Sequence, residues 1–267
     1  MRLHILDVGQ GDTIIIEMPM GAEKKAFGVI DCIRFDDVTL PYLQELDVKE
    51  LAFACGTHPH LDHIQDIPKL FETYKVGEYW ESGYKPEYEA AYQKDLIQYI
   101  EASLIKKVIV RAGTQIQFGE TILHILSPPP SLSWDSKDPI FNNNNASIVI
   151  SVQYGLSRVL LTADANFGCW AHIWVTHKHL MKAQAVKISH HGSIHGNFLE
   201  CLEYIDPKYA IISVGADNLY NFPAKSTMEF LLERIIGDPN RVFITRDHGH
   251  ITITSNGSQK LEITTEK

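Results

Sequence analysis

The stretch that decides the fold is "THPHLDH" (residues 57–63), in which seven positions hold three histidines and one aspartate. It follows "ELAFACG" (50–56), an apolar run typical of a buried strand, and leads into a segment with helical apolar spacing, Leu61 to Tyr74. Imidazole nitrogens and carboxylates are ligands of zinc and other divalent transition metals. A single loop histidine is usually polar surface, whereas this clustering has no packing rationale. The stretch therefore predicts a metal site at a strand-to-helix turn.

Four side chains of this turn are candidate metal ligands. His58 and His60 are two residues apart, so on an extended chain they project to the same side. Asp62 and His63 follow where the chain turns into the predicted helix. One turn cannot easily enclose two ions with four ligands, so we expect further ligands from distant segments.

Two later segments end apolar strands with such side chains. "VLLTAD" (159–164) ends in Asp164, a carboxylate that would be costly to bury unpaired, the alternative being a helix N-cap. "AVKISHHGS" (185–193) carries His190 and His191. Neighbours on an extended chain point to opposite sides, so we expect one of them to bind metal and the other to contact substrate or donate a proton.

Composition bounds the class of protein. The chain has 267 residues, of which 45% are hydrophobic and 21% charged, enough for a full globular core. The amino-terminal stretch lacks a signal-peptide pattern, and no apolar run approaches the roughly 18–20 residues that cross a bilayer. Four cysteines without a CxxC pair predict free thiols and a reducing compartment: Cys32, Cys55, Cys169 and Cys201. We expect a cytoplasmic protein without membrane contact.

The formal net charge of −9 disfavours extended, non-specific binding of duplex nucleic acid. An anionic substrate would need a local positive field from bound metal and a few lysines. Lys187 and the stretch "HKHLMK" (177–182) could supply it, although a solvated surface is the plainer interpretation of both.

Strand and helix signals follow one another in the same order in each half of the chain, antiparallel strands first and helix–strand alternation after. This order predicts one domain, residues 1–267, with two mixed sheets packed face to face and helices outside. The strands predicted in the first half are 2–8, 12–18, 26–32 and 50–55, with helices over 39–47, 61–74 and 86–104. Those predicted in the second half are 114–119, 120–127, 146–154, 157–164, 183–188, 208–215, 241–245 and 250–255, with a helix over 224–235.

Taken together, the motifs resemble the metallo-β-lactamase superfamily, and more narrowly the metallo-β-lactamase-like domain of ComEC-type proteins in free-standing form. The resemblance lies in "LDVGQGD" (6–12), "VID" (29–31), "THPHLDH" (57–63), "NNNNASIVI" (142–150), "LLTADA" (160–165), "KISHHGS" (187–193) and "PKYAIISVGADNLYNFP" (207–223). It implies an α/β fold, the metallo-β-lactamase-like four-layer αβ/βα sandwich. It also implies two divalent metal ions at one sheet edge, Zn²⁺ first and Mn²⁺ as the alternative.

Carried over by position, the resemblance implies a ligand set in which His190 is preferred to His191. That set is His58 and His60 for the first metal, Asp62, His63 and His190 for the second, and Asp164 as the bridge. Many superfamily members have a further first-site histidine about twenty residues before the bridging aspartate. Here the position reads "NNNNAS" (142–147), so an amide oxygen of Asn143, Asn144 or Asn145, or a water molecule, would take its place. Phe222 stands where relatives commonly carry histidine.

The chemistry implied is hydrolysis by a metal-bridging hydroxide. Asp62 is the candidate that orients the attacking water, and His191 is the second catalytic candidate. We favour a phosphodiester bond in a small molecule or a nucleic acid, hence a nuclease or phosphodiesterase, because the resembled branch handles DNA. The alternatives are a lactonase or thioesterase on the same site and a non-catalytic, metal-binding regulatory module. A protein partner could supply the substrate channel that a net-acidic surface does not.

Overall fold

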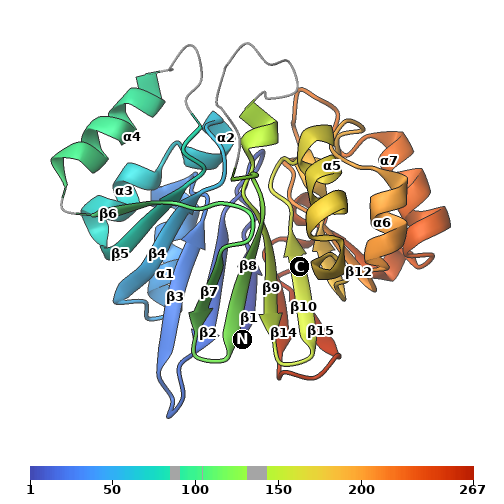
Figure 1. Cartoon of the computed structure of the whole chain (residues 1–267), viewed down its shortest axis with the longest axis horizontal. Helices are drawn as coiled ribbons and strands as arrows, with labels where there is room; N and C mark the ends of the chain where they lie inside the picture. The colour runs from blue at the N-terminus through green and yellow to red at the C-terminus, as the bar shows by residue number, and fades with distance from the viewer. Residues whose placement is uncertain (85–90, 104, 131–142) are drawn as a thin grey trace.

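The computed structural model describes residues 1–84, 91–103, 105–130 and 143–267. Within them two β-sheets pack face to face, and helices cover the outer face of each sheet (Figure 1). The first sheet runs in the order β15 (Leu261–Thr265), β14 (Ile251–Ser255), β1 (Arg2–Ile5), β2 (Ile14–Pro19), β3 (Lys25–Ile30), β4 (Glu50–Gly56), β5 (Lys75–Glu81) and β6 (Lys106–Ile109). The second runs in the order β13 (Val242–Ile244), β12 (Tyr209–Ile212), β11 (Ala185–Lys187), β10 (Ser157–Leu161), β9 (Val149–Tyr154), β8 (Thr121–Ser127) and β7 (Gln115–Phe118).

Helices follow the parallel strands of both sheets. Those of the first half are α1 (Leu40–Glu45), α2 (Leu61–Ile64), α3 (Ile67–Thr73) and α4 (Ala91–Ala102); those of the second are α5 (Phe167–Thr176), α6 (Leu199–Ile205), α7 (Lys225–Phe230) and α8 (Thr245–His248). Short π-helical turns span Phe35–Thr39 and Leu231–Ile235, and 3₁₀ turns span Asn143–Ala146, Lys178–Leu180, Ser189–Gly192 and Pro239–Arg241. None of the described helices is long and apolar enough to span a bilayer.

Three apolar clusters hold these layers together. The central cluster lies between the sheets and joins side chains such as Ile16 and Phe53 to Ile150 and Val159. The other two lie between each sheet and its helices. A strand with helices on one face and a second sheet on the other is buried on both faces, which explains the nearly continuous apolar run in β2. The predicted α/β four-layer sandwich is confirmed.

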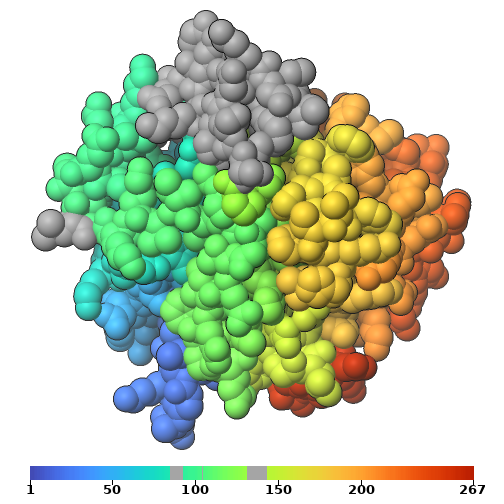
Figure 2. Space-filling view, in the orientation of Figure 1, coloured from blue at the N-terminus to red at the C-terminus, as the bar shows by residue number. Residues whose placement is uncertain are grey.

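Each sheet changes from antiparallel to parallel pairing part-way across. In the first sheet β1, β2 and β3 pair antiparallel, and β3, β4, β5 and β6 pair parallel. In the second, β7 to β10 pair antiparallel and β10 to β13 parallel. Parallel strands end at a common edge, and in open sheets that edge is where ligands bind. In the space-filling view β7 and β8 (green) adjoin α5 (yellow) to form one continuous face (Figure 2).

The structure departs from the predicted elements in a few places. The helix predicted over 61–74 is two helices, α2 and α3, separated at Asp66. The carboxylate of Asp66 accepts a hydrogen bond from the backbone N–H of Phe35 (3.0 Å), and its own N–H donates to the carbonyl of Cys32 (2.9 Å). These tertiary bonds compete with continued helix. The start of the helix predicted over 86–104 lies outside the described residues, as does most of the segment 131–145, whose polar composition predicts a loop.

Three strands and three helices had no strong sequence signal. β5 contains a glycine, and β6 begins with two lysines, so neither shows a clear apolar pattern. β15, α5, α6 and α8 were also not predicted. All four cysteines are buried free thiols, as the sequence predicted.

Candidate metal centre

The candidate ligands come from three strand ends that the two sheets bring together. The histidine-rich turn follows β4 in the first sheet. Asp164 follows β10, and the histidine pair follows β11, its parallel neighbour in the second sheet. The site therefore lies where the carboxyl ends of parallel strands from both sheets meet.

Asp164 lies at the middle of the site, with each carboxylate oxygen facing a different pair of imidazoles. Its Oδ2 lies 3.8 Å from Nε2 of His58 and 3.7 Å from Nε2 of His190. Its Oδ1 lies 3.4 Å from Nε2 of His63 and 3.6 Å from Nε2 of His191. One buried carboxylate thus joins two groups of nitrogen ligands.

The two groups are completed by residues of the same turn. Nδ1 of His60 lies 3.0 Å from Nε2 of His58, and Oδ2 of Asp62 lies 3.5 Å from Nε2 of His191. Within each group the ligand atoms lie within 4.8 Å of one another: His58, His60 and Asp164 in the first, Asp62, His63 and His191 in the second. The structure therefore brings together every candidate ligand that the sequence indicated.

Hydrogen bonds on the far side of two imidazoles orient them. Nδ1 of His63 lies 2.7 Å from Oδ2 of Asp31, and Nδ1 of His191 lies 2.8 Å from the backbone carbonyl of Ser213. Both acceptors require the proton on Nδ1, so in the neutral imidazole, which is the form that binds a metal ion, Nε2 carries the lone pair that faces Asp164. Asp31 is itself held by the N–H and the hydroxyl of Thr57, each at 2.8 Å.

Charge within the site is set by burial and by the carboxylates. Burial lowers the pKa of His58 well below its ordinary value, and nearby His63 adds to that effect. Burial also tends to lower the pKa of His63. The carboxylates of Asp164 and Asp31 have the larger effect and raise the pKa of His63 well above its ordinary value. Burial alone would raise the pKa of Asp164, but the imidazoles of His191 and His63 hold that pKa well below its usual range. Asp164 is therefore an ionised carboxylate.

The two adjacent histidines lie differently from the sequence expectation. We expected an extended segment, but His190 and His191 both adopt left-handed backbone conformations, with φ of 50° and 52°. The extended assignment is wrong, because the chain turns sharply here into Gly192. In this turn His191, rather than His190, groups with Asp62 and His63. His190 faces the oxygen of Asp164 that also faces His58. Which of the two binds metal, and at which site, stays a prediction.

Among the asparagines proposed to replace a histidine, Asn144 contacts a candidate ligand. Its Nδ2 is 3.5 Å from Nδ1 of His190, and within the described chain its side-chain oxygen is buried without a hydrogen-bond partner. The side-chain oxygen of Asn145 instead accepts from the N–H of Gly168 (3.0 Å). Asn142 lies outside the described residues. Asn144 is thus the asparagine whose position fits an additional ligand.

The donor set fits divalent metal ions. In the described part of the chain, Nε2 of His63, Nε2 of His191 and Oδ1 of Asp164 are buried and lack a hydrogen-bond partner. Three buried polar atoms that converge without hydrogen-bond partners are costly, and a cation bound by the neutral imidazoles and the carboxylate would compensate them. Imidazole nitrogens with carboxylate oxygens suit zinc and neighbouring transition metals.

The candidate ligands differ in their exposure. The side chains of His58, His63 and His191 are at most 1% exposed. Asp62 is 32% exposed, His190 is 22% exposed, and His60 is also partly exposed. Within the described chain, these three residues form the solvent-facing part of the site.

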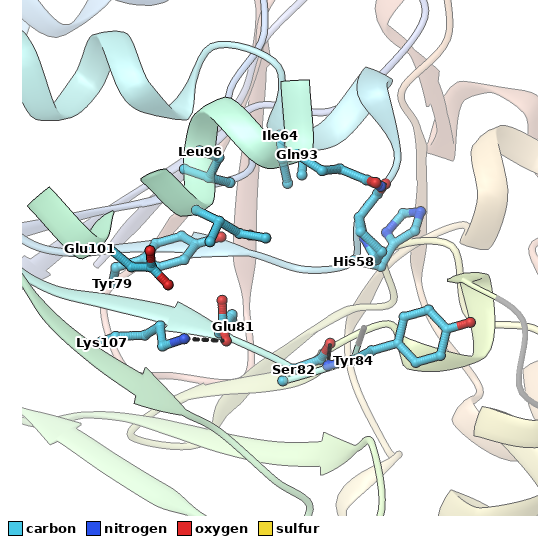
Figure 3. A pocket seen from close by; sticks show the side chains of 14 residues that line it. His58, Ile64, Tyr79, Glu81, Ser82, Tyr84, Gln93, Leu96, Glu101 and Lys107 are labelled. Carbon is cyan, nitrogen blue, oxygen red and sulfur yellow. Dashed lines mark hydrogen bonds and ion pairs between the residues drawn. The ribbon is translucent and has the colours of Figure 1, made fainter. Parts of the chain in front are cut away.

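A separate pocket of about 320 Å³ adjoins the histidine-rich turn between α4 and the β5–β6 edge (Figure 3). Tyr79 and Leu96 contribute apolar surface to it, and Glu81 and Glu101 contribute carboxylates. Lys107 pairs with Glu81 at 3.4 Å, as the dashed line in Figure 3 shows. The pocket therefore has a net acidic lining and does not suit an anionic group.

A family model, described as the metallo-beta-lactamase superfamily, matches residues 6–216. The chain belongs to the metallo-beta-lactamase superfamily. Within that superfamily it is similar to ComE operon protein 3 of Bacillus subtilis strain 168, with 25% identity over 267 residues. The match covers 94% of this chain and 32% of that protein, so the chain spans about a third of the length of this relative.

Solved structures of the metallo-beta-lactamase superfamily share the fold. Zn²⁺-bound PqqB from Methylobacterium extorquens has a TM-score of 0.60 and 10% identity, covering 96% of this chain and 100% of that one. A diphosphatase from the PhnP family has a TM-score of 0.53 and 12% identity, and the match covers 94% of this chain and 86% of that one. At such identities the likeness shows the fold alone.

Sequence reasoning missed the residues that support the ligands. Asp12 and Asp31 lie in the motifs "LDVGQGD" and "VID", which carried the family resemblance without an assigned role. Asp12 precedes the apolar strand β2, and Asp31 follows the apolar strand β3. A position next to an apolar strand is also the signal that identified Asp164. Lys187 was considered only as surface charge, whereas it is buried and lies 2.6 Å from Asp12.

Proposed function

We propose that this protein is a dinuclear metal-dependent hydrolase that cleaves phosphodiester bonds. The observation that carries the proposal is the position of Asp164, whose two oxygens face two separate groups of ligands. A carboxylate placed in this way suits a bridge between two cations. No purely structural role explains six polar ligands converging on one opening.

The ligand assignment proposed from the geometry has two parts. The first metal is held by His58, His60 and Asp164, with His190 or Asn144 completing the site. The second is held by Asp62, His63, His191 and Asp164. Four imidazoles in the set, or five if His190 completes the first site, favour Zn²⁺ over Mg²⁺ or Ca²⁺, and Mn²⁺ remains the alternative.

Two divalent ions, when bound, supply a nucleophile from water at neutral pH and stabilise negative charge on the reacting oxygens. The chain's own residues position the reactants. The partly exposed carboxylate of Asp62 is placed to accept a hydrogen bond from the attacking water. If Asn144 completes the first metal site, the partly exposed His190 is placed to donate a hydrogen bond to a substrate oxygen. His191 is fully buried, so we assign it to metal binding in place of the catalytic role first expected.

The phosphodiester bond is favoured by the chemistry of the centre and by the related proteins. Two closely spaced cations suit the in-line displacement of a phosphoryl group, because they stabilise both the attacking and the leaving oxygen. The sequence also resembles the ComEC branch. The nuclease or phosphodiesterase assignment rests on these two lines of support.

The test combines metal content with a substrate panel. Protein loaded with Zn²⁺ or Mn²⁺ is assayed with bis-p-nitrophenyl phosphate, single-stranded DNA, a lactone and a thioester, and the bound metal is counted by elemental analysis. We expect about two ions per chain and cleavage of the phosphodiesters. Asp164→Asn should lose both the bound metal and the cleavage of phosphodiesters. Asp47→Asn changes an exposed carboxylate outside the candidate ligand set and should keep the metal and the activity.

Two results would contradict the proposal. Turnover of the acyl substrates alone would make the protein a lactonase or thioesterase. Fewer than one ion per chain, with no turnover of any substrate, would favour a regulatory module.

A further inference from the structure

Two aromatic side chains form a stacked pair on a surface loop beside the site opening. The rings of Tyr220 and Phe222 have centroids 5.4 Å apart and an interplanar angle of 18°. Tyr220 is 67% exposed. We call this pair, Tyr220 and Phe222, the aromatic platform. Large apolar rings held in a stack at the surface usually mark a binding surface, because their exposure is otherwise unfavourable.

One imidazole separates the platform from the candidate metal centre. The ring of Phe222 contacts that of His190 edge-on, with centroids 5.6 Å apart and an interplanar angle of 66°. On its other side Nε2 of His190 lies 3.7 Å from Oδ2 of Asp164. The platform therefore lies next to a partly exposed residue of the candidate metal centre.

Hydrogen bonds and packing hold the platform loop in place. The side chain of Asn218 donates to the carbonyls of Gly215 and Phe222, both at 2.9 Å, and accepts from the N–H of Phe222 at 2.7 Å. The N–H of Ala224 donates to the carbonyl of Gly192 at 3.0 Å. A preformed surface loses little conformational entropy when a ligand binds, so this loop suits recognition.

Close packing also ties the loop to the histidine turn. A Cβ atom at Gly192 would lie 2.5 Å from Cβ of Pro223, so only glycine permits this approach. Gly192 directly follows His191. The platform and the candidate ligands therefore keep a constant relative position.

We propose that the aromatic platform stacks the base of a nucleotide whose phosphodiester lies at the metal centre. This inference rests on the proposed function and names its substrate class. Each nucleobase offers a flat π-face that stacks on tyrosine or phenylalanine without regard to its sequence identity. In a nucleotide one sugar separates the planar base from the phosphate. In this protein one imidazole, that of His190, separates the platform from Asp164, so the base and the phosphate can reach the two places together.

A cation also lies beside the platform loop. The guanidinium of Arg246 donates to the carbonyl of Phe222 at 3.2 Å, and its Nε lies 3.3 Å from Oδ1 of Asp247. Because Arg246 is paired with a carboxylate, the rings, and not this charge, orient the nucleotide.

Two phosphodiesters with the same leaving group test the proposal. Thymidine 5′-(p-nitrophenyl phosphate) carries a base, and methyl p-nitrophenyl phosphate does not. In metal-loaded protein we expect Tyr220→Ala to raise KM for the thymidine ester about tenfold while kcat stays unchanged. Neither constant should change for the methyl ester.

Matched variants separate stacking from general damage to the loop. Tyr220→Phe keeps an aromatic face and should behave as the unmodified protein. Leu219→Ala removes a neighbouring apolar side chain that is 93% exposed and should also change nothing. Equal effects of Tyr220→Ala on both esters, or no effect on either, would overturn the platform assignment.

A binding measurement keeps this inference distinct from the proposed function. If neither ester is cleaved, the proposed function fails, and the platform is then tested by calorimetry with thymidine 5′-monophosphate and with inorganic phosphate. We expect Tyr220→Ala to weaken binding of the nucleotide about tenfold and to leave phosphate binding unchanged. Equal affinities of Tyr220→Ala and the unmodified protein for the nucleotide would overturn the inference.

Discussion

The ammonium group of Lys187 lies 2.6 Å from Oδ2 of Asp12, and both side chains are 1% exposed. The two residues belong to different sheets, since Asp12 precedes β2 and Lys187 ends β11. Oδ1 of Asp12 lies 3.8 Å from Nδ1 of His191, and Oδ2 lies 3.8 Å from Nδ1 of His63. A buried ion pair thus joins the two sheets directly behind two candidate metal ligands.

Removing the cation of this pair should destabilise the protein strongly. Lys187→Met leaves the carboxylate of Asp12 buried without its compensating charge, which typically lowers the free energy of unfolding by about 3–5 kcal/mol. Urea unfolding of metal-free protein measures the effect, and the double variant Lys187→Met/Asp12→Asn should recover most of the loss. Lys49→Met removes an exposed ion pair and should change the free energy by less than about 1 kcal/mol. Similar losses in the two single variants would contradict the prediction.

The hydrogen bond from His63 to Asp31 should control metal affinity. Asp31→Asn weakens the acceptor that holds the His63 proton on Nδ1, and substitution of such a supporting residue typically lowers metal affinity by about 10- to 100-fold. Competition with a chromophoric chelator measures the affinity for Zn²⁺. Asp36→Asn is the matched control, because Asp36 is 66% exposed and pairs only with Lys69 among the described ion pairs. Unchanged affinity in Asp31→Asn would mean that the imidazole needs no such support.

The convergence of the candidate ligands could be predicted from sequence because they are local in two respects. Four of them lie within six residues, and Asp164 and the histidine pair each follow an apolar strand. Strand ends of parallel sheets meet at one edge, so their convergence follows from the fold. The different positions of His190 and His191 could not be predicted, because they depend on two left-handed residues in succession. A tertiary hydrogen bond from the His190 N–H to the carbonyl of Ala163 (3.0 Å) accompanies that conformation.

The supporting residues were missed for a different physical reason. Asp31, Asp12 and Lys187 look like ordinary charged residues beside strands, and only their burial shows that they are paired. Burial of these side chains arises from the face-to-face packing of two sheets, which brings together residues as distant in sequence as Asp12 and Lys187. A single sequence does not contain that pairing information.

Gly11 should be required for the position of the Asp62 backbone. A Cβ atom at Gly11 would lie 2.3 Å from the carbonyl oxygen of Asp62, and φ at Gly11 is +136°. Gly9 also has a positive φ, of +75°, but a Cβ atom there would meet nothing within 4 Å. Gly9→Ala should therefore cost only the backbone strain of about 1–2 kcal/mol. Gly11→Ala should cost more and should also weaken metal binding, because the Asp62 turn must move.

Thermal unfolding and chelator competition on both glycine variants check this prediction. Equal losses of stability, with unchanged affinity for Zn²⁺ in each variant, would show that the Asp62 turn adapts to the added methyl group. A loss of affinity confined to Gly11→Ala is the expected result.

His4 should make the stability of the protein fall in mild acid, independently of the metal centre. Burial lowers the pKa of His4 from 6.5 to about 4, although Glu17 nearby acts in the opposite direction. The unfolded chain, with a pKa near 6.5, therefore binds a proton more readily than the folded chain does. The neutral His4 ring therefore contributes fully to the free energy of unfolding above pH 6.5. This contribution, about 3 kcal/mol in all, is lost as the pH falls toward 4. Urea unfolding at pH 7.0, 5.5 and 4.5 measures this loss of unfolding free energy.

His4→Gln should be less stable than the unmodified protein at pH 7.0, since the ring hydrogen bonds to Tyr42 and Thr252 are lost, and the difference should shrink as the pH falls. His179→Gln, at an exposed histidine, should follow the unmodified protein at every pH. A difference between His4→Gln and the unmodified protein that stays constant with pH would show that His4 does not titrate in this range.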